Sequence, residues 1–253
     1  MSRALAGVVC VVTGAARGIG LAIAEQFAAE GGRVACVDVS ERRLEPAVGA
    51  LTGRGVDARA YPVDVGSQAG VRTMFEQVER DFAAPVGVLV NNAVWARFQP
   101  LAEIDVETVG HMFAVGLEGM IWTLQAAAPQ MQRRGGGAVI NLCSTSALQA
   151  IPNSIAYAAM KAGVLGLTRA AAVELSPRRI RVNAIVPGMI GTPASVAQFD
   201  AATIAKRQAH MPLGRFGEPG EIAAVAAFLA SDDSSYIQGA AIVADGGWTI
   251  AAT

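Results

Sequence analysis

Ser144, Tyr157 and Lys161 have the residue types and the spacing of a proton-transfer site. Tyr157 and Lys161 are four residues apart, so on a helix they share a face and the phenol can lie beside the ammonium group. The pKa of a free tyrosine is about 10, and a cation about 4 Å away supplies the roughly 4 kcal/mol that would lower it by about three units. We therefore predict that Tyr157 acts as general acid and base, that Lys161 lowers its pKa, and that Ser144 hydrogen-bonds a substrate oxygen.

A glycine-rich turn near the N-terminus predicts a binding site for a dinucleotide. An apolar run ends at Thr13, and Gly14, Gly18 and Gly20 lie where a helix begins. Glycine permits the tight turn and a close backbone approach, while the free N–H groups of the helix attract a pyrophosphate. Because a strand, a turn and a helix follow in this order, the motif is far more specific than its glycines alone.

Asp38, at the end of the second predicted strand, bears on which dinucleotide binds. Its carboxylate can accept hydrogen bonds from the adenosine ribose and would repel a 2′-phosphate. Arg17 in the glycine turn, with Arg42 and Arg43 after the strand, is the counter-evidence. On balance the sequence predicts NAD rather than NADP.

Composition excludes several classes of protein. The chain has 253 residues, 53% of them hydrophobic, which is enough for one large core. Its net charge is −1 and no basic stripe is present, which argues against a nucleic-acid partner, and its apolar runs are too short to span a membrane. The three cysteines, Cys10, Cys36 and Cys143, lack metal or disulfide spacing, and with only two histidines we expect reduced, buried thiols and no metal site.

The first residues imitate a secretion signal, with Arg3 followed by an apolar stretch over 4–12. Removing that stretch would delete the strand that the glycine turn requires. We therefore expect a cytoplasmic protein.

Short β-branched runs alternate with longer helical patterns, which is typical of repeated βαβ units. The predicted strands are 7–13, 33–39, 58–63, 86–91, 138–144, 180–186 and 240–244, and the predicted helices are 19–30, 41–51, 68–82, 105–133, 154–175 and 218–230. We predict a single α/β domain over residues 1–253, a doubly wound Rossmann fold with a seven-stranded parallel sheet and helices on both faces. The stretch 188–212 has little strand character, and its apolar content favours a lid over a ligand.

These residues together resemble the short-chain dehydrogenase/reductase family over nearly the whole chain. Residues 13–20 resemble its cofactor loop, 64–65 the pair that lines the adenine, 91–93 the segment after the fourth strand, and 187–192 the segment that cradles the nicotinamide carboxamide. Ser144, Tyr157 and Lys161 match its catalytic residues in type and spacing. The resemblance also implies that Lys161 holds the nicotinamide ribose, and that the chain forms a homotetramer.

The expected site residues are therefore numerous. The predicted cofactor-binding residues are Gly14, Arg17, Gly18, Ile19, Gly20, Asp38, Asp64, Val65, Asn91, Ala93, Tyr157, Lys161, Pro187, Gly188, Ile190 and Thr192. The predicted walls of an apolar substrate pocket are Val94, Trp95, Leu148, Ile151, Met189 and Phe199.

Two residues depart from the family pattern. Val94 stands where the family has a glycine after its Asn-Asn-Ala, and Gly116 stands where many members carry a fourth catalytic residue, an asparagine. Glycine retains a backbone carbonyl but weakens a helix by about 1 kcal/mol relative to alanine. The resemblance therefore supports a catalytic triad and not a tetrad.

The leading hypothesis is an NAD-dependent dehydrogenase or ketone reductase for a mid-sized, largely apolar secondary alcohol, a small molecule. The alternative within enzymes is an NADPH-dependent 3-oxoacyl reductase, for which Arg17, Arg133, Arg134 and Arg169 offer basic surface to an acidic carrier. An alternative of another class is a dinucleotide-binding regulator with weak catalysis, suggested by Gly116.

Overall fold

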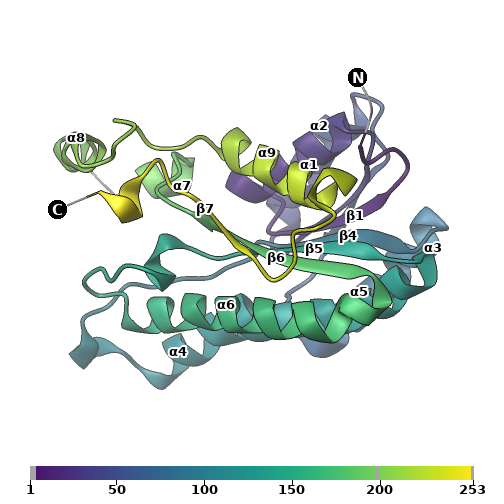
Figure 1. The fold of residues 1–253 in the computed structure, drawn as a ribbon, viewed down its shortest axis with the longest axis horizontal. Helices are drawn as coiled ribbons and strands as arrows, with labels where there is room; N and C mark the ends of the chain where they lie inside the picture. The colour runs from purple at the N-terminus through teal and green to yellow at the C-terminus, as the bar shows by residue number, and fades with distance from the viewer. Residues whose placement is uncertain (1–3, 198–199, 252–253) are drawn as a thin grey trace.

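Seven parallel strands form one sheet among the residues described by this computed structural model, which are 4–197 and 200–251 (Figure 1). The strands are β1 (Val9–Thr13), β2 (Arg33–Asp38), β3 (Ala58–Pro62), β4 (Val86–Asn91), β5 (Gly137–Leu142), β6 (Ile180–Pro187) and β7 (Ala241–Ala244). Their order is β3-β2-β1-β4-β5-β6-β7, and each neighbouring pair is parallel. The order reverses between β1 and β4, which is where ligands bind in such sheets.

The apolar runs form central strands because both faces of the sheet are covered. Each residue of β1 and β4 is buried, and successive side chains enter opposite cores. Val9 and Val11 pack into one core, whereas Cys10 and Val12 pack into the other. This two-sided burial explains why the strands are continuous apolar runs rather than alternating ones.

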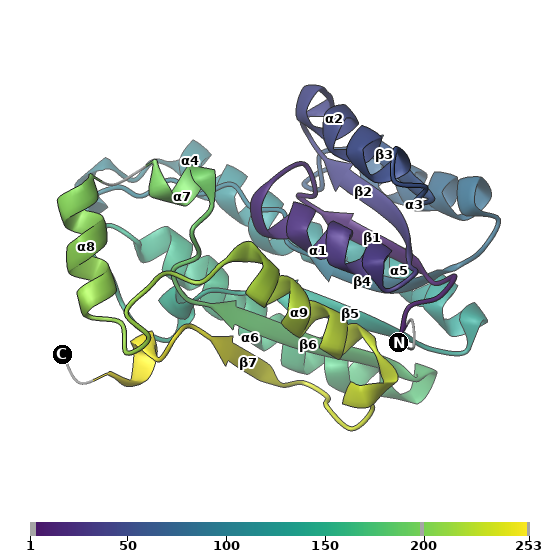
Figure 2. The same ribbon diagram turned by 90° about the horizontal axis from the view of Figure 1, so that it is seen from above.

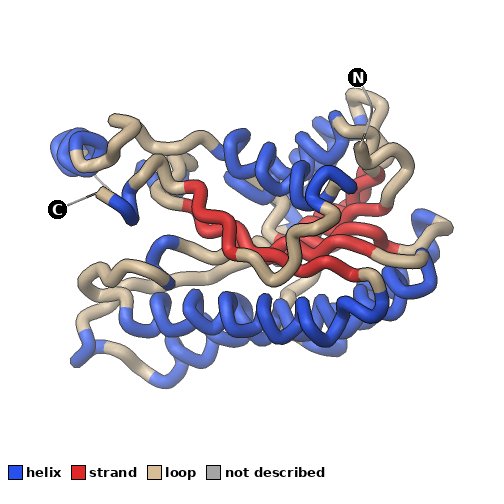
Figure 3. The backbone as a smooth tube through the Cα atoms, viewed as in Figure 1, coloured by secondary structure: helices blue, strands red, loops and turns tan. Residues whose placement is uncertain are grey.

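Helices cover the sheet in two layers, as Figures 1 and 3 show. One layer contains α1 (Gly18–Ala29), α2 (Glu41–Thr52) and α9 (Pro219–Ala230), and the other contains α3 (Gln68–Phe82), α4 (Val106–Phe113), α5 (Gly119–Arg134) and α6 (Ile155–Leu175). The predicted doubly wound α/β fold is confirmed. None of the helices in the described part of the chain combines the length and the apolar character needed to span a membrane.

The long helix predicted over 105–133 is interrupted. Residues Ala114–Glu118 form a π-helical turn between α4 and α5, which we call the π segment, and Gly116 lies within it. A π turn adds one residue to a helical turn and is frequent at functional sites.

The stretch 188–212 contains two helices that the sequence analysis did not predict. They are α7 (Pro193–Val196) and α8 (Ala201–Ala209), and they follow the carboxyl end of β6 (Figure 2). The Thr192 side chain accepts a hydrogen bond from the Ser195 backbone N–H and so caps α7, and Asp200 caps α8 in the same way through Thr203. Phe199, predicted to line the substrate pocket, lies outside the described residues.

Candidate active site

The turn between β1 and α1 requires glycine. Gly14 and Gly18 have φ of +66° and +59°, in the left-handed region. A Cβ on Gly14 would lie 2.7 Å from the Asn92 Nδ2, and one on Gly20 would lie 2.5 Å from the same atom. No side chain among the described residues caps the start of α1. Its N–H groups therefore face the space beside the turn, where an anion would be favourable.

Hydrogen bonds join the carboxyl ends of β1 and β4 at the point where the strand order reverses. The Thr13 Oγ1 donates to the Val90 carbonyl at 3.1 Å and accepts from the backbone N–H groups of Asn92 and Ala93 at 2.9 and 3.0 Å. The Asn92 side chain donates to the Thr13 carbonyl at 2.9 Å. These bonds fix the loop after β4 against the glycine turn.

A cavity of about 480 Å³ opens at this point. The predicted residues that line it are Gly14, Arg17, Gly18, Ile19, Asp38, Asp64, Val65, Ala93, Val94, Trp95 and Thr192. Its lining also contains residues that we did not predict as site residues, namely Val39, Arg43, Val63, Asn92, His111, Val115 and Pro193. Asn92 lies within the segment 91–93 discussed above, and Val115 and Pro193 adjoin Gly116 and Thr192, so their sequence neighbours signalled them, whereas nothing local signalled His111.

Asp38 is fixed at one end of this cavity by backbone donors. Its Oδ1 accepts from the Ser40 N–H at 2.9 Å and its Oδ2 accepts from the Ala16 N–H at 3.3 Å. Each carboxylate oxygen can accept more than one hydrogen bond, so both remain able to bind hydroxyl groups. Arg17 and Arg43 line the same cavity and place positive charge near the carboxylate.

Ser144, Tyr157 and Lys161 come together at the carboxyl end of β5, outside the lining of that cavity. Ser144 follows β5 by two residues, and its Oγ accepts from the Ser146 N–H at 3.1 Å. Tyr157 and Lys161 share one face of α6, with the Lys161 Nζ 5.9 Å from the centroid of the Tyr157 ring. The Nζ donates to the Leu142 carbonyl at 2.8 Å, which connects α6 to the last residue of β5.

The electrostatics of the triad differ from our expectation. Burial raises the pKa of Tyr157 above its ordinary value, and the opposing effect of the Ser144 hydroxyl is smaller. Burial also lowers the pKa of Lys161 to about 8. The predicted lowering of the Tyr157 pKa is therefore wrong for this structure, because burial of the phenol outweighs the effects that oppose it.

One aromatic side chain contacts the triad, and two more lie in the lining of the cavity. The Phe98 ring lies 5.2 Å from the Tyr157 ring between centroids, at an interplanar angle of 53°. Trp95 and His111 meet edge to face at 4.8 Å in the lining of the cavity. Phe98 lies three residues after Trp95 in the sequence, and this contact places it beside the triad.

Some predicted pocket and cofactor residues do not reach the first cavity. Leu148 and Ile151 are exposed on the loop before α6. Met189 and Ile190 line a second cavity, of about 480 Å³, against the strand β7. Gly188 packs so closely that a Cβ would lie 2.7 Å from the Asp245 Cα, and its N–H donates to the Ala244 carbonyl at 3.1 Å. Pro187 is buried as the last residue of β6.

Asn91 is committed to the sheet. Its Nδ2 donates to the Asn141 Oδ1 at 2.9 Å, and its Oδ1 accepts from the Thr123 hydroxyl at 2.7 Å. The Asn141 Nδ2 donates in turn to the Thr168 hydroxyl at 3.0 Å. The structure thus places Asn91 in a buried polar chain between β4, β5 and the helices α5 and α6, whereas its neighbours Asn92 and Ala93 face the cavity.

Within 4–197 and 200–251, His, Cys, Asp and Glu side chains do not gather in the groups of three that could hold a metal ion. The three cysteines are free and buried. The Cys143 thiol donates to the Lys161 carbonyl at 3.2 Å, so it packs α6 against the end of β5.

Comparisons with known proteins agree with this arrangement. A family model described as enoyl-(acyl carrier protein) reductase matches residues 14–249. The D-threitol dehydrogenase of Mycolicibacterium smegmatis is 38% identical over 246 residues, which cover 97% of this chain and 94% of that protein. A 3-oxoacyl-(acyl-carrier-protein) reductase of Thermotoga maritima is also 38% identical over 246 residues, covering 97% of this chain and 99% of that protein.

Solved structures show the same fold with a nicotinamide dinucleotide bound. A gluconate 5-dehydrogenase from Burkholderia cenocepacia, in complex with NADP and tartrate, matches with a TM-score of 0.93 and 31% identity over 99% of this chain and 98% of that chain. A 7α-hydroxysteroid dehydrogenase, complexed with NADH and 7-oxo glycochenodeoxycholic acid, matches with a TM-score of 0.93 and 29% identity over 97% of this chain and 96% of that chain. From its sequence, its fold and these relatives, the chain belongs to the short-chain dehydrogenase/reductase family of oxidoreductases.

Proposed function

We propose that the protein is an NAD-dependent dehydrogenase that interconverts a mid-sized, largely apolar secondary alcohol and its ketone. The observation that carries this proposal is the convergence of Ser144, Tyr157 and Lys161 at the carboxyl end of β5. The relatives act on quite different molecules by their names, so the family does not choose the substrate.

The cavity beside the glycine turn fits a dinucleotide. Gly14 and Gly18 form a cradle that side chains would fill, the start of α1 offers N–H groups to a pyrophosphate, and Asp38 can accept from ribose hydroxyls. We propose NAD because the Asp38 carboxylate would repel a 2′-phosphate. Arg17 and Arg43 in the same lining are the opposing evidence, and related structures contain either cofactor.

The bound cofactor would accept or supply the hydride, and the chain's residues would handle the proton and the oxygen. In the proposed mechanism the Tyr157 phenolate accepts the proton of the alcohol during oxidation and becomes the phenol, and during reduction the phenol returns that proton to the substrate oxygen. The Ser144 hydroxyl would hydrogen-bond the same oxygen and stabilise its developing charge. Lys161 would hold the cofactor ribose and keep a positive charge close to Tyr157.

Apolar side chains on the loops next to the triad support an apolar substrate. The exposed large apolar residues on the loops after β4 and β5 are Val94, Trp95, Phe98, Leu148 and Ile151. Phe98 contacts the ring of Tyr157 itself, so a substrate bound at the phenol would meet an aromatic wall. Binding sites for small molecules are lined mostly by apolar and aromatic side chains, which these loops present beside the triad.

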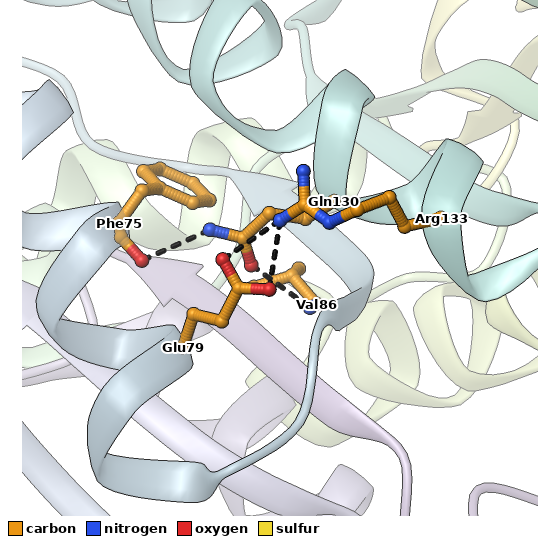
Figure 4. A network of polar contacts seen from close by, with 5 residues as sticks. All are labelled: Phe75, Glu79, Val86, Gln130 and Arg133. Atoms are coloured by element: carbon orange, nitrogen blue, oxygen red, sulfur yellow. Dashed lines mark hydrogen bonds and ion pairs between the residues drawn. The ribbon is translucent and has the colours of Figure 1, made fainter.

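The alternative of a 3-oxoacyl reductase is suggested by the names of several relatives but has less support from the structure. Arg133, one of the basic residues considered for carrier binding, donates to both carboxylate oxygens of Glu79 at 2.7 Å (Figure 4). Beside it, Gln130 accepts from the N–H of Val86, the first residue of β4. Arg133 thus lies at the amino end of the strands and the triad at the carboxyl end, so Arg133 cannot guide a carrier directly to the triad.

We also infer a cytoplasmic homotetramer. Free, buried cysteines suit a reducing compartment. Exposed apolar side chains on α5, α6 and the edge strand β7, namely Ile121, Val173 and Val243, supply surface that assembly would bury. Light scattering of the purified protein would measure the number of chains directly.

A two-dimensional screen of substrate against cofactor tests the proposed function. The purified protein is assayed with NAD and NADP on matched secondary alcohols: alicyclic, aryl-alkyl and steroid-like alcohols, open-chain polyols, and, in reverse, a 3-oxoacyl thioester. We expect turnover with NAD on apolar alcohols that exceeds turnover on polyols. Turnover with NADPH that exceeds turnover with NADH at least about tenfold, a ratio that corresponds to about 1.4 kcal/mol, would contradict the assignment of NAD. If turnover is best on the thioester, the result would favour a 3-oxoacyl reductase. If wild type and Tyr157→Phe show equal turnover, or none, across the panel, the result would favour a dinucleotide-binding regulator.

A further inference from the structure

The helix α6 and the π segment meet through two reciprocal glycine contacts. On the π segment, a Cβ on Gly116 would lie 2.7 Å from the Met160 Sδ and 2.8 Å from its Cε. On α6, a Cβ on Gly163 would lie 3.0 Å from the Leu117 Cδ2. Each helix therefore inserts one large side chain over a glycine of the other, and the two backbones approach more closely than any larger residue would allow.

The Met160 side chain is fully buried, so a Cβ at position 116 would have to displace its thioether within a densely packed core. Directly after the π segment, at the first residue of α5, the backbone also lies close to the loop after β3, because a Cβ on Gly119 would lie 3.0 Å from the Val65 Cγ2. A side chain added at position 116 would therefore displace the Met160 thioether or move α6 away from the π segment.

Met160 directly precedes Lys161 on α6, so a displacement of the helix backbone at Met160 also moves Lys161. Lys161 is 2% exposed, and two contacts fix it to the end of β5. Its Nζ donates to the Leu142 carbonyl at 2.8 Å, and its own carbonyl accepts from the Cys143 thiol at 3.2 Å. These contacts hold the ammonium on the sheet side of α6, and the Met160–Gly116 contact holds α6 against the π segment in the same helix layer.

We propose that Met160 is a positioning residue for Lys161, acting through its contact with Gly116. The thioether fills the space over the glycine, sets how closely α6 approaches the π segment, and thereby sets where the Lys161 ammonium lies relative to Tyr157. On this view Gly116 is small because Met160 occupies the space of a side chain at that position. The inference rests on the proposed function for its consequence in catalysis, but the geometry of Tyr157 and Lys161 can be followed without turnover.

The experiment is a double-mutant cycle of Gly116→Ala, Met160→Ala and the combined variant, with a matched cycle at the second contact. The control cycle uses Gly163→Ala and Leu117→Ala, which alter the same pair of helices but not the residue next to Lys161. Three quantities are measured in each variant: the pH dependence of kcat/KM, the Kd for NADH from its fluorescence, and the ultraviolet titration of the tyrosine that Tyr157→Phe removes. Thermal unfolding midpoints record the purely structural effect.

We expect Gly116→Ala to lower kcat/KM at least about tenfold and Met160→Ala in the same protein to recover most of that loss. The coupling between the two mutations would then be within the range found for residues in contact. We expect Met160→Ala alone to shift the Tyr157 titration toward its ordinary value, because removing the thioether admits water beside the phenol and the ammonium. The control cycle should lower the unfolding midpoint without moving the Tyr157 titration.

Independent effects of Gly116→Ala and Met160→Ala, which simply multiply, would overturn the proposal. So would an unchanged Tyr157 titration in Met160→Ala, even where the unfolding midpoint falls. If Gly116→Ala does not fold, Met160→Ala carries the test, because it only removes atoms. A wild-type protein that oxidises no alcohol would refute the proposed function, yet the NADH affinity and the tyrosine titration would still decide whether Met160 positions Lys161.

Discussion

The Lys161 ammonium donates a hydrogen bond to the Leu142 carbonyl oxygen at 2.8 Å, in a site where the lysine is almost completely buried. A buried ammonium is normally costly because it loses its hydration, and the pKa of Lys161 falls to about 8 for that reason. The carbonyl at the end of β5 replaces part of the lost water. The contact therefore holds a positive charge next to Tyr157 at neutral pH.

Replacing Lys161 by methionine should change how stability depends on pH. The folded pKa of Lys161, about 8, is below its ordinary value of 10.5, so the unfolded chain binds more protons between these values. The stability that Lys161 contributes is thus full above about 10.5 and is lost as pH falls through about 8. We therefore measure the unfolding midpoint of each protein as a function of pH and subtract that of Lys161→Met from that of wild type. We expect this difference to increase as pH rises from about 8 to about 10.5.

In the difference between wild type and Lys161→Met, the effects of titrating groups that both proteins contain cancel. Burial raises the pKa of Cys10 and Cys36 to about 12, which lowers stability as pH rises above 9.0, but both thiols are present in both proteins. Lys206→Met, at an exposed lysine on α8, is the control and should show no such trend. A difference between wild type and Lys161→Met that stays constant with pH would contradict the assignment.

Tyr157→Phe should abolish most of the turnover and leave cofactor binding intact. The change removes the proton donor and keeps the ring that packs on Phe98, so kcat should fall by about 10² to 10⁴. The Kd for NADH should stay within about threefold, because the lost hydroxyl carries little of the binding energy. Tyr236→Phe, at an exposed tyrosine, is the matched control and should behave as wild type. A kcat for Tyr157→Phe within tenfold of wild type would remove Tyr157 from the mechanism.

The parts of the site that depend on local pattern could be predicted from the sequence. The strand, glycine turn and helix at Thr13–Gly20 and the shared face of Tyr157 and Lys161 are set by neighbouring residues. The caps of α7 and α8 were also present in the sequence, as Thr192-Pro193 and as Asp200 with Thr203, and could have predicted both helices.

Other features depend on contacts between distant residues. Nothing near Lys161 in the sequence shows that its ammonium meets the Leu142 carbonyl, and nothing near Gly116 shows that Met160 lies over it. The π segment escaped prediction because one extra residue in a turn barely changes the apolar pattern of a long helix. The pKa of Tyr157 could not be predicted because it depends on burial by the whole fold.

Asp38→Asn should weaken discrimination between the two cofactors. The amide keeps a hydrogen-bond acceptor for a ribose hydroxyl but loses the charge that would repel a 2′-phosphate, and Arg17 and Arg43 in the same cavity would then favour it. We expect the ratio of kcat/KM with NAD to that with NADP to fall at least about tenfold, which corresponds to about 1.4 kcal/mol. Asp64→Asn, in the same lining, is the control and should change both cofactors alike. A wild-type preference for NADP would contradict the premise.

Phe98→Ala should weaken binding of apolar substrates more than it slows the chemical step. The Phe98 ring is 43% exposed and lies against Tyr157, so it presents an aromatic surface beside the reacting hydroxyl. Aromatic pairs contribute about 0.5–1.5 kcal/mol beyond the area they bury, so we expect KM for an aryl-alkyl alcohol to rise by about 2- to 10-fold. Phe228→Ala on α9 is a matched control, because Phe228 is 42% exposed and lies in the other helix layer. Equal changes in KM for Phe98→Ala and Phe228→Ala, or a KM for polyols that rises as much as that for the aryl-alkyl alcohol, would show that Phe98 does not select an apolar substrate.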